Sequence, residues 1–214
     1  MMNKRKAFEG FCGYRNMSKE LEKVGFTVRS VDNDSYFEGA EIKDILTINP
    51  ESMKDYYLMW FSPPCTGFSV ASIGTHWGGG YRKYIPQTDT VKLGLKLLEH
   101  SIKIIALSKP KKWYIENPRG VMRKVIDGIF KKHGVGGVIR HTVTYCQYGD
   151  NRMKPTDIWT NDIEWKPKPM CKNGDTCHVS APRGSKTGTQ GLKGSRERSM
   201  IPIELCREIS QLNT

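Results

Sequence analysis

A cysteine in a prolyl loop is the first residue whose position supports chemistry. Cys65 follows the apolar run 56–61, which is typical of a buried strand, and Pro63 and Pro64 end that strand because proline cannot donate to a sheet ladder. The thiol then lies just beyond the strand's carboxyl end, where open α/β sheets place their reacting groups. A thiolate there can act as a nucleophile, whereas the alternative is a small buried residue with no reactive role.

Two further stretches bring charged side chains to the end of a predicted strand. The strand pattern 113–115 ends at Glu116, with a proline two residues later, and the strand pattern 141–145 leads on to Arg152 and Lys154. If the three strands are neighbours, a thiol, a carboxylate and two cations converge on one pocket at the sheet edge.

A glycine-containing turn follows the first predicted strand. Gly10 and Gly13 let the backbone turn tightly and approach a ligand, and a helix expected at 17–24 points its amino end at the same place. The next strand, 27–31, ends at Asp32, roughly 20 residues beyond the turn, where nucleotide-binding βαβ units place the acid that binds ribose hydroxyls. The glycine turn and Asp32 together predict an adenosine-containing ligand, and a nicotinamide cofactor remains an alternative.

Size and charge limit the classes of protein and partner. With 214 residues, the chain is long enough for one domain with a full core and short for two. Lysine and arginine outnumber the acidic residues 34 to 22, and the net charge is +12. This charge favours a polyanionic partner, nucleic acid first, over a basic protein without one.

The cysteines and the hydropathy pattern indicate the compartment. Six scattered cysteines, with no signal peptide, indicate a reducing environment and not a disulfide framework. No apolar run approaches the ~20 residues needed to cross a bilayer. We therefore predict a cytoplasmic protein with no membrane role, favour a monomer, and leave the oligomeric state open.

Together these residues resemble the cytosine carbon-5 methyltransferase family. Pro64-Cys65, followed by Phe68-Ser69, resembles the family's nucleophile motif, and Glu116-Asn117-Pro118 resembles its ENV motif. Tyr148-Gly149, with the cations that follow, resembles its YG…QxRxR segment, with Lys154 in place of the second arginine. The motifs occur in the family's order and cover nearly the whole chain.

The resemblance implies a fold and a cofactor. The fold is α/β, the Rossmann-like class I S-adenosylmethionine-dependent methyltransferase fold, with a doubly wound, mostly parallel sheet. Segment 8–13 resembles the family's FxGxG motif with the second glycine displaced by one, which implies S-adenosyl-L-methionine. Asp44-Ile45 resembles the pair that holds the adenine, against the alternative of an aspartate on a surface turn. Ser199 matches the serine of the final Gly-Asn-Ser-Val motif, where Arg198 replaces asparagine.

These patterns define a set of candidate site residues. The predicted catalytic residues are Cys65, Glu116, Arg152 and Lys154. The predicted cofactor-binding residues are Phe8, Gly10, Phe11, Gly13, Asp32, Asn33, Asp44, Ile45, Pro64 and Ser199.

Two long segments lack a regular pattern. Segment 66–90 is rich in glycine and is predicted to close over a nucleic acid backbone, with His76 and Trp77 either contacting a base or packing the loop. Segment 162–195 occupies the position of the family's much longer target recognition domain, and we predict a short basic loop or hairpin there. Among the cations in or directly after this segment are Arg183, Lys186, Lys193 and Arg196. These four are expected either to contact a phosphate backbone or to lie in a solvated loop.

Three potential metal ligands lie in this second segment. Cys171, Cys177 and His178 have a C-x5-C-H spacing, which lacks both the paired pattern of zinc sites and a fourth ligand. We therefore predict no metal site, while zinc binding by these three residues stays open as the alternative.

The resemblance implies a mechanism on a cytosine flipped out of duplex DNA. Cys65 adds to carbon 6, Glu116 protonates or hydrogen-bonds N3, and Arg152 and Lys154 hold the carbonyl and a phosphate. The absent recognition domain favours a minimal, phage-encoded enzyme acting in the host cytosol. Two alternatives stay open: an enzyme that modifies cytosine in RNA or in a free nucleotide, and a catalytically degenerate DNA-binding or host-interaction protein.

Overall fold

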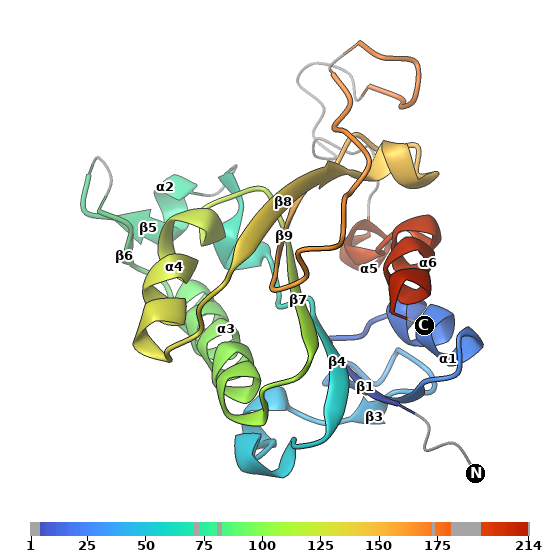
Figure 1. Ribbon diagram of the computed structural model, residues 1–214. Helices are drawn as coiled ribbons and strands as arrows, with labels where there is room; N and C mark the ends of the chain where they lie inside the picture. The colour runs from blue at the N-terminus through green and yellow to red at the C-terminus, as the bar shows by residue number, and fades with distance from the viewer. Residues whose placement is uncertain (1–4, 71–72, 81–82, 173, 181–193, 214) are drawn as a thin grey trace.

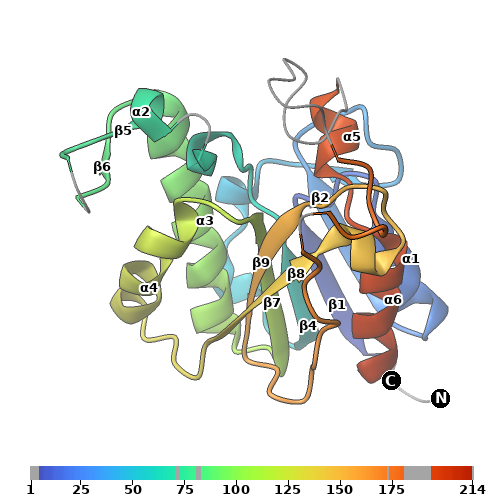
Figure 2. The same cartoon turned by 90° about the horizontal axis from the view of Figure 1, so that it is seen from above.

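A seven-stranded sheet with helices on both faces forms the body of the protein, shown as a computed structural model in Figures 1 and 2. The structure describes residues 5–70, 73–80, 83–172, 174–180 and 194–213. The strands are β1 (Lys6–Gly10), β2 (Thr27–Asp32), β3 (Glu41–Ile42), β4 (Tyr56–Phe61), β5 (Trp77–Gly78), β6 (Ile85–Pro86), β7 (Lys112–Pro118), β8 (Ile139–Thr144) and β9 (Pro155–Thr160). The α-helices are α1 (Asn16–Lys23), α2 (Ile73–His76), α3 (Asp89–Ser108), α4 (Met122–Lys132), α5 (Ser195–Ser199) and α6 (Ile203–Leu212).

The sheet is mostly parallel and doubly wound. Its strand order is β3-β2-β1-β4-β7-β9-β8, and the first five of these strands run parallel. β9 runs antiparallel to both β7 and β8. β5 and β6 form a separate two-stranded hairpin. The predicted fold class is confirmed, and the bounds predicted for β4 match those of the structure.

β9 was not predicted. The convergence described above was conditional on the strand at 141–145 lying beside the strand that carries Glu116, and that condition is not met, because β9 lies between β7 and β8. Its sequence begins with Pro155 and contains Asp157, and both residue types are depleted in strands. Because β9 is antiparallel, its amino end lies at the edge where the parallel strands have their carboxyl ends. Lys154, immediately before β9, therefore still reaches the predicted edge.

Both faces of the sheet are buried, as expected for parallel strands linked by helices. Along β4, Leu58 and Trp60 belong to one core cluster, and Met59 and Phe61 belong to the other. The first cluster includes residues of α1 and α6, and the second includes residues of α3 and α4. Figures 1 and 2 show these two helix pairs on opposite sides of the sheet. The alternation along β4 thus fixes which helices cover which face.

The segment after Cys65 is packed against the body at its start. A 3-10 helix, η3 (Thr66–Phe68), comes first, and the buried indole of Trp77 donates its N–H to the carbonyl of Gly67 at 2.6 Å. The imidazole Nδ1 of His76 shares a hydrogen bond of 2.7 Å with the Thr88 hydroxyl. Of the two roles left open for His76 and Trp77, these contacts favour packing of the loop.

No helix within the described ranges combines the length and the hydrophobicity that crossing a bilayer requires. Arg183, Lys186 and Lys193, named above for phosphate contacts, lie outside the described residues.

The loop of the predicted nucleophile also depends on Gly120. The backbone N–H of Val121 donates to the carbonyl of Phe68 at 2.8 Å, and a Cβ atom at position 120 would overlap that oxygen. We expect Gly120→Ala to lower the free energy of unfolding by about 2 kcal/mol, because the contact must open. The matched control is Gly128→Ala in α4, where a Cβ meets nothing within 4 Å and should raise stability by about 0.5 kcal/mol. Urea unfolding checks both; equal stability of the two variants would contradict the packing described.

Candidate active site

One pocket opens at the carboxyl ends of β1, β4 and β7, where the connections of the sheet reverse direction. The loop between β1 and α1 forms one wall, the prolyl loop after β4 forms another, and the segment between α5 and α6 closes it. Its lining residues are Glu9, Phe11, Cys12, Gly13, Tyr14, Asn16, Ser62, Pro63, Pro64, Cys65, Glu116, Pro118, Lys154, Ser199, Met200 and Ile201.

Three of the four predicted catalytic residues line this pocket. Cys65 follows β4 in an exposed loop, Glu116 is buried near the end of β7, and Lys154 is buried immediately before β9. Three segments far apart in the sequence thus place a thiol, a carboxyl and an ammonium group around the same space. This arrangement is suited to nucleophilic addition assisted by an acid.

The carboxyl group of Glu116 and the ammonium of Lys154 are an electrostatically linked buried pair. Burial raises the pKa of Glu116, while Lys154 and hydrogen bonds from Tyr145 and Ser62 oppose the rise. The Tyr145 hydroxyl donates to Glu116 Oε1 at 2.8 Å. Burial lowers the pKa of Lys154, and the charge of Glu116 opposes that change. Each group therefore limits the desolvation penalty of the other.

The thiol of Cys65 is under opposing influences. Desolvation in the pocket raises its pKa even though the residue as a whole is exposed. The Lys154 ammonium lowers the pKa, and the Glu116 carboxylate raises it. Protonation of Glu116 and retention of the Lys154 charge would therefore both favour the thiolate.

Arg152, the fourth predicted catalytic residue, is not part of the pocket lining. Its guanidinium Nε donates to both carboxylate oxygens of Asp150, at 2.7 and 2.8 Å. The two terminal nitrogens donate to carbonyls at 3.1 to 3.3 Å, namely those of Glu197, Arg198 and Met200. In this arrangement Arg152 ties the turn before β9 to the segment that closes the pocket, which is a positioning contact.

The predicted cofactor residues separate into two groups. Phe11, Gly13, Pro64 and Ser199 line the pocket. Phe8 and Ile45 belong to the hydrophobic core and are not among the residues that line the pocket. Gly10 makes room in that core, because a Cβ there would lie 2.8 Å from Ile45 Cδ1 and 2.9 Å from Phe61 Cδ1.

The predicted acids interact with their own backbone. Asp32 accepts hydrogen bonds from the N–H groups of Gly13 and Asp34, both at 2.9 Å. It therefore holds the β1–α1 loop in shape. Asp44 accepts from the N–H of Leu46 at 2.9 Å, which is the surface-turn alternative named above, and Asn33 is exposed.

Three contributors to the site were not predicted. Glu9 lines the pocket, and burial raises its pKa to about 7 against hydrogen bonds from Ser18. Asn16 donates its amide to the carbonyl of Ile201 at 2.7 Å, joining two walls. Tyr145 holds Glu116. The only available signal was a carboxylate directly after the apolar residues Ala7 and Phe8 of the first strand, since the other two contacts join distant segments.

No family model matches the chain. A protein of Frog virus 3 (isolate Goorha) named "Probable DNA (cytosine-5)-methyltransferase" is 31% identical over 176 residues, which cover 74% of this chain and 76% of that protein.

Solved structures show the same fold at low sequence identity. Entamoeba histolytica methyltransferase EhMeth matches with a TM-score of 0.56 and 15% identity, covering 79% of this chain and 57% of that one. S. pombe Dnmt2 methyltransferase matches with a TM-score of 0.53 and 14% identity, covering 78% and 52%. The chain spans about half the length of the solved proteins that it matches.

The resemblance seen in the motifs is thus supported by a relative aligned over three quarters of both chains and by the shared fold. This chain belongs to the DNA (cytosine-5)-methyltransferase family.

Proposed function

We propose that the chain methylates carbon 5 of cytosine in DNA, with S-adenosyl-L-methionine as the methyl donor. The observation that carries the proposal is that Cys65, Glu116 and Lys154 line the same pocket as the β1–α1 loop. A nucleophile, an acid and a nucleotide-type loop are the components that this reaction requires side by side.

The pocket fits the proposed cofactor. Phe11 and Gly13 both have positive φ, at 58° and 49°, so the loop turns sharply at the end of β1. Glu9 and Tyr14 supply a carboxyl group and an aromatic ring, which suit a cationic sulfonium. When bound, S-adenosyl-L-methionine supplies an electrophilic methyl group. Phe11, Gly13, Pro64 and Ser199 are the residues that we propose hold it.

Cys65 makes carbon 5 reactive. Its thiolate adds to carbon 6 of the ring and moves electron density toward carbon 5 and N3. Glu116 in its acid form donates to N3, and burial favours that form by raising its pKa. Loss of the carbon-5 proton later restores the 5,6 double bond and releases the Cys65 thiolate.

Lys154 supplies the positive charge of the site. Its ammonium stabilises the Cys65 thiolate, which is the direction of its effect on the thiol pKa. Lys154 also donates to the carbonyl of Arg198 at 2.9 Å. We propose that Lys154 contacts the target base. Arg152, in the same turn before β9, positions Lys154.

DNA is the proposed substrate because of the relative's name and the charge of +12. The target base must leave the duplex to meet a thiol in a pocket, at a cost of a few kcal/mol. We propose that segment 162–195 takes the place of a recognition domain, and that the chain is one catalytic domain.

The proposal is tested by methylation of a mixed DNA pool with a radiolabelled methyl donor. We expect label on carbon 5 of cytosine, and we expect Cys65→Ser to reduce it by on the order of 10³-fold or more, because the hydroxyl is a far weaker nucleophile. Cys206→Ala, a buried cysteine in α6, is the matched control and should retain activity.

Two outcomes would contradict the proposal. Label in tRNA but not in DNA would replace the substrate with RNA. No label in either, with tight DNA binding retained, would indicate a binding protein on a methyltransferase scaffold.

The electrostatics predict opposite shifts of the Cys65 pKa in two variants. Lys154→Gln should raise it, because a stabilising cation is lost, and Glu116→Gln should lower it, because a repelling carboxylate is lost. The measurement is the rate of iodoacetamide labelling at Cys65 against pH, followed by peptide mass spectrometry. Lys111→Gln, just before β7 at the opposite sheet edge, is the control and should leave the profile in place. Shifts of the same sign in both active-site variants would rule out this charge arrangement.

A further inference from the structure

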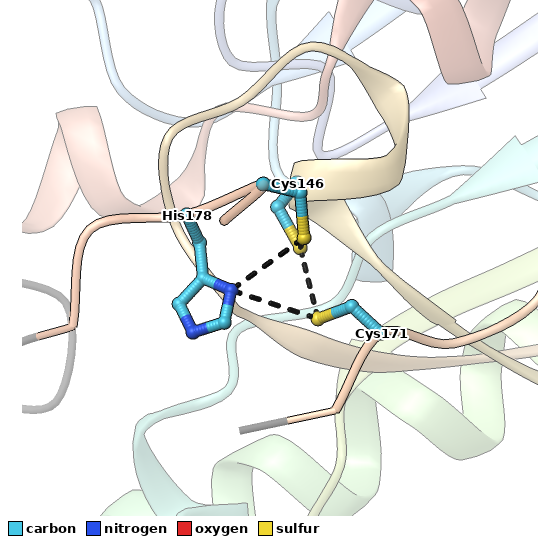
Figure 3. A group of neighbouring side chains, drawn as sticks. Cys146, Cys171 and His178 are labelled. Atoms are coloured by element: carbon cyan, nitrogen blue, oxygen red, sulfur yellow. Dashed lines mark hydrogen bonds between the residues drawn. The ribbon is translucent and has the colours of Figure 1, made fainter. Parts of the chain in front are cut away.

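Three cysteines and a histidine gather outside the methyltransferase pocket. One ligand comes from η5 (Tyr145–Tyr148), the 3-10 helix after β8, and the others come from the irregular segment after β9. We call this group the Cys3His cluster; its members are Cys146, Cys171, Cys177 and His178. The labelled side chains in Figure 3 point toward one another. Their ligand atoms all lie within 4.8 Å of one another.

The spacing of these atoms fits a tetrahedral metal ion. Zinc with Zn–S bonds of about 2.3 Å and Zn–N bonds of about 2.0 Å separates its ligand atoms by about 3.5 to 3.8 Å. The Sγ of Cys177 lies 3.6 Å from the Sγ of Cys146 and 3.6 Å from the Nδ1 of His178. The Sγ of Cys171 lies 3.8 Å from the same Nδ1 and 3.1 Å from the Sγ of Cys146. Of these four separations, only the last must widen for an ion at the centre.

A disulfide explains the group less well. The Sγ atoms of Cys146 and Cys171 are 3.1 Å apart, whereas a disulfide bond measures about 2.05 Å. Such a bond would also leave Cys177 and the His178 imidazole facing it without a role. Three thiolates and an imidazole together are instead a preferred ligand set for zinc.

The surroundings of the cluster match those of a metal site. Cys146 and Cys171 are buried, and the side-chain amide of Gln147 donates to the Sγ of Cys177 at 3.4 Å. The Nδ1 of His178 faces the sulfurs, and its Nε2 is buried and has no hydrogen-bond partner among the described residues. Ligand sulfur that accepts an N–H bond is typical of an outer shell that orients metal ligands.

We propose that the Cys3His cluster binds one structural zinc ion. Four protein ligands complete a tetrahedron and leave no open position for a substrate or water, so the ion has a structural and not a catalytic role. The proposal concerns a site separate from the methyltransferase pocket and does not depend on the proposed reaction.

The ion would anchor the segment that follows β9 to the edge of the sheet where the active site lies. The described part of segment 161–180 contains no helix or strand, so few backbone bonds hold it. The cluster attaches it to η5, and the N–H of Val179 donates to the carbonyl of Asn151 at 2.9 Å. Asn151 lies in the turn before β9, three residues before Lys154. Zinc would thus supply the rigidity that a full recognition domain gains from its own core.

The cluster was missed in the sequence because its ligands are not contiguous. Cys146 lies 25 residues before Cys171, in a different element, so the C-x5-C-H spacing showed three of four ligands.

The test is the metal content of the untagged full chain, purified under reducing conditions without added chelator. Inductively coupled plasma mass spectrometry should find one zinc ion per chain. Cys171→Ser and His178→Gln should lose it, while Cys206→Ala and His133→Gln, outside the cluster, should keep it. Replacement of the ion by Co²⁺ should give the intense visible absorption of tetrahedral thiolate coordination.

Three results would overturn the proposal. The first is a folded wild-type chain that contains no zinc and whose thiols are all free. The second is an intact mass lower by two hydrogen atoms, with a peptide linking Cys146 to Cys171. The third is zinc that is retained at the wild-type level in both cluster variants, which would place the ion elsewhere. The wild-type measurement remains decisive even where a variant fails to fold.

Discussion

The buried ammonium group of Lys154 is the charge on which the site depends. An isolated cation is costly to bury, so the surrounding structure must compensate it. The Glu116 carboxyl group, the carbonyl of Arg198 and the ring face of Tyr145, 4.7 Å away, provide that compensation. The contact with Arg198 also holds α5 at the edge of the pocket. One desolvated charge thus holds α5 at the pocket and opposes the rise that burial causes in the pKa of the Cys65 thiol.

The sheet topology makes this arrangement possible. β4 and β7 present Cys65 and Glu116 at their carboxyl ends, as parallel strands do. A further parallel strand would present only its own carboxyl end at this edge. β9 is antiparallel, so the residue before it reaches the edge instead, and this residue is Lys154. The reversal of a single strand thereby adds a cation to a thiol and an acid.

Much of this organisation could be predicted from the residues. β4 is an apolar element that ends before Pro63 and Pro64, and its bounds were predicted directly. β9 was missed because it contains Pro155 and Asp157, residue types that are uncommon in a strand paired on both sides. The structure tolerates the buried carboxylate of Asp157 because Arg123 Nε donates to it at 2.8 Å. The hydrogen bond between Asp32 and the N–H of Gly13 could not be predicted because it joins the end of β2 to the separate β1–α1 loop, and the ribose-binding role of Asp32 stays a prediction. Cys146 joined its partners only through tertiary structure.

The central claim is that Cys65 forms a covalent bond with the target cytosine, and trapping that bond tests it most directly. A duplex pool in which 5-fluorocytosine replaces cytosine is incubated with the chain and S-adenosyl-L-methionine. Because fluorine cannot leave as a proton does, the thiol cannot be released, and a complex that survives denaturation should form with the nucleotide attached to the peptide containing Cys65. Attachment at another residue, or methylation of normal cytosine with no trapped complex, would contradict the account.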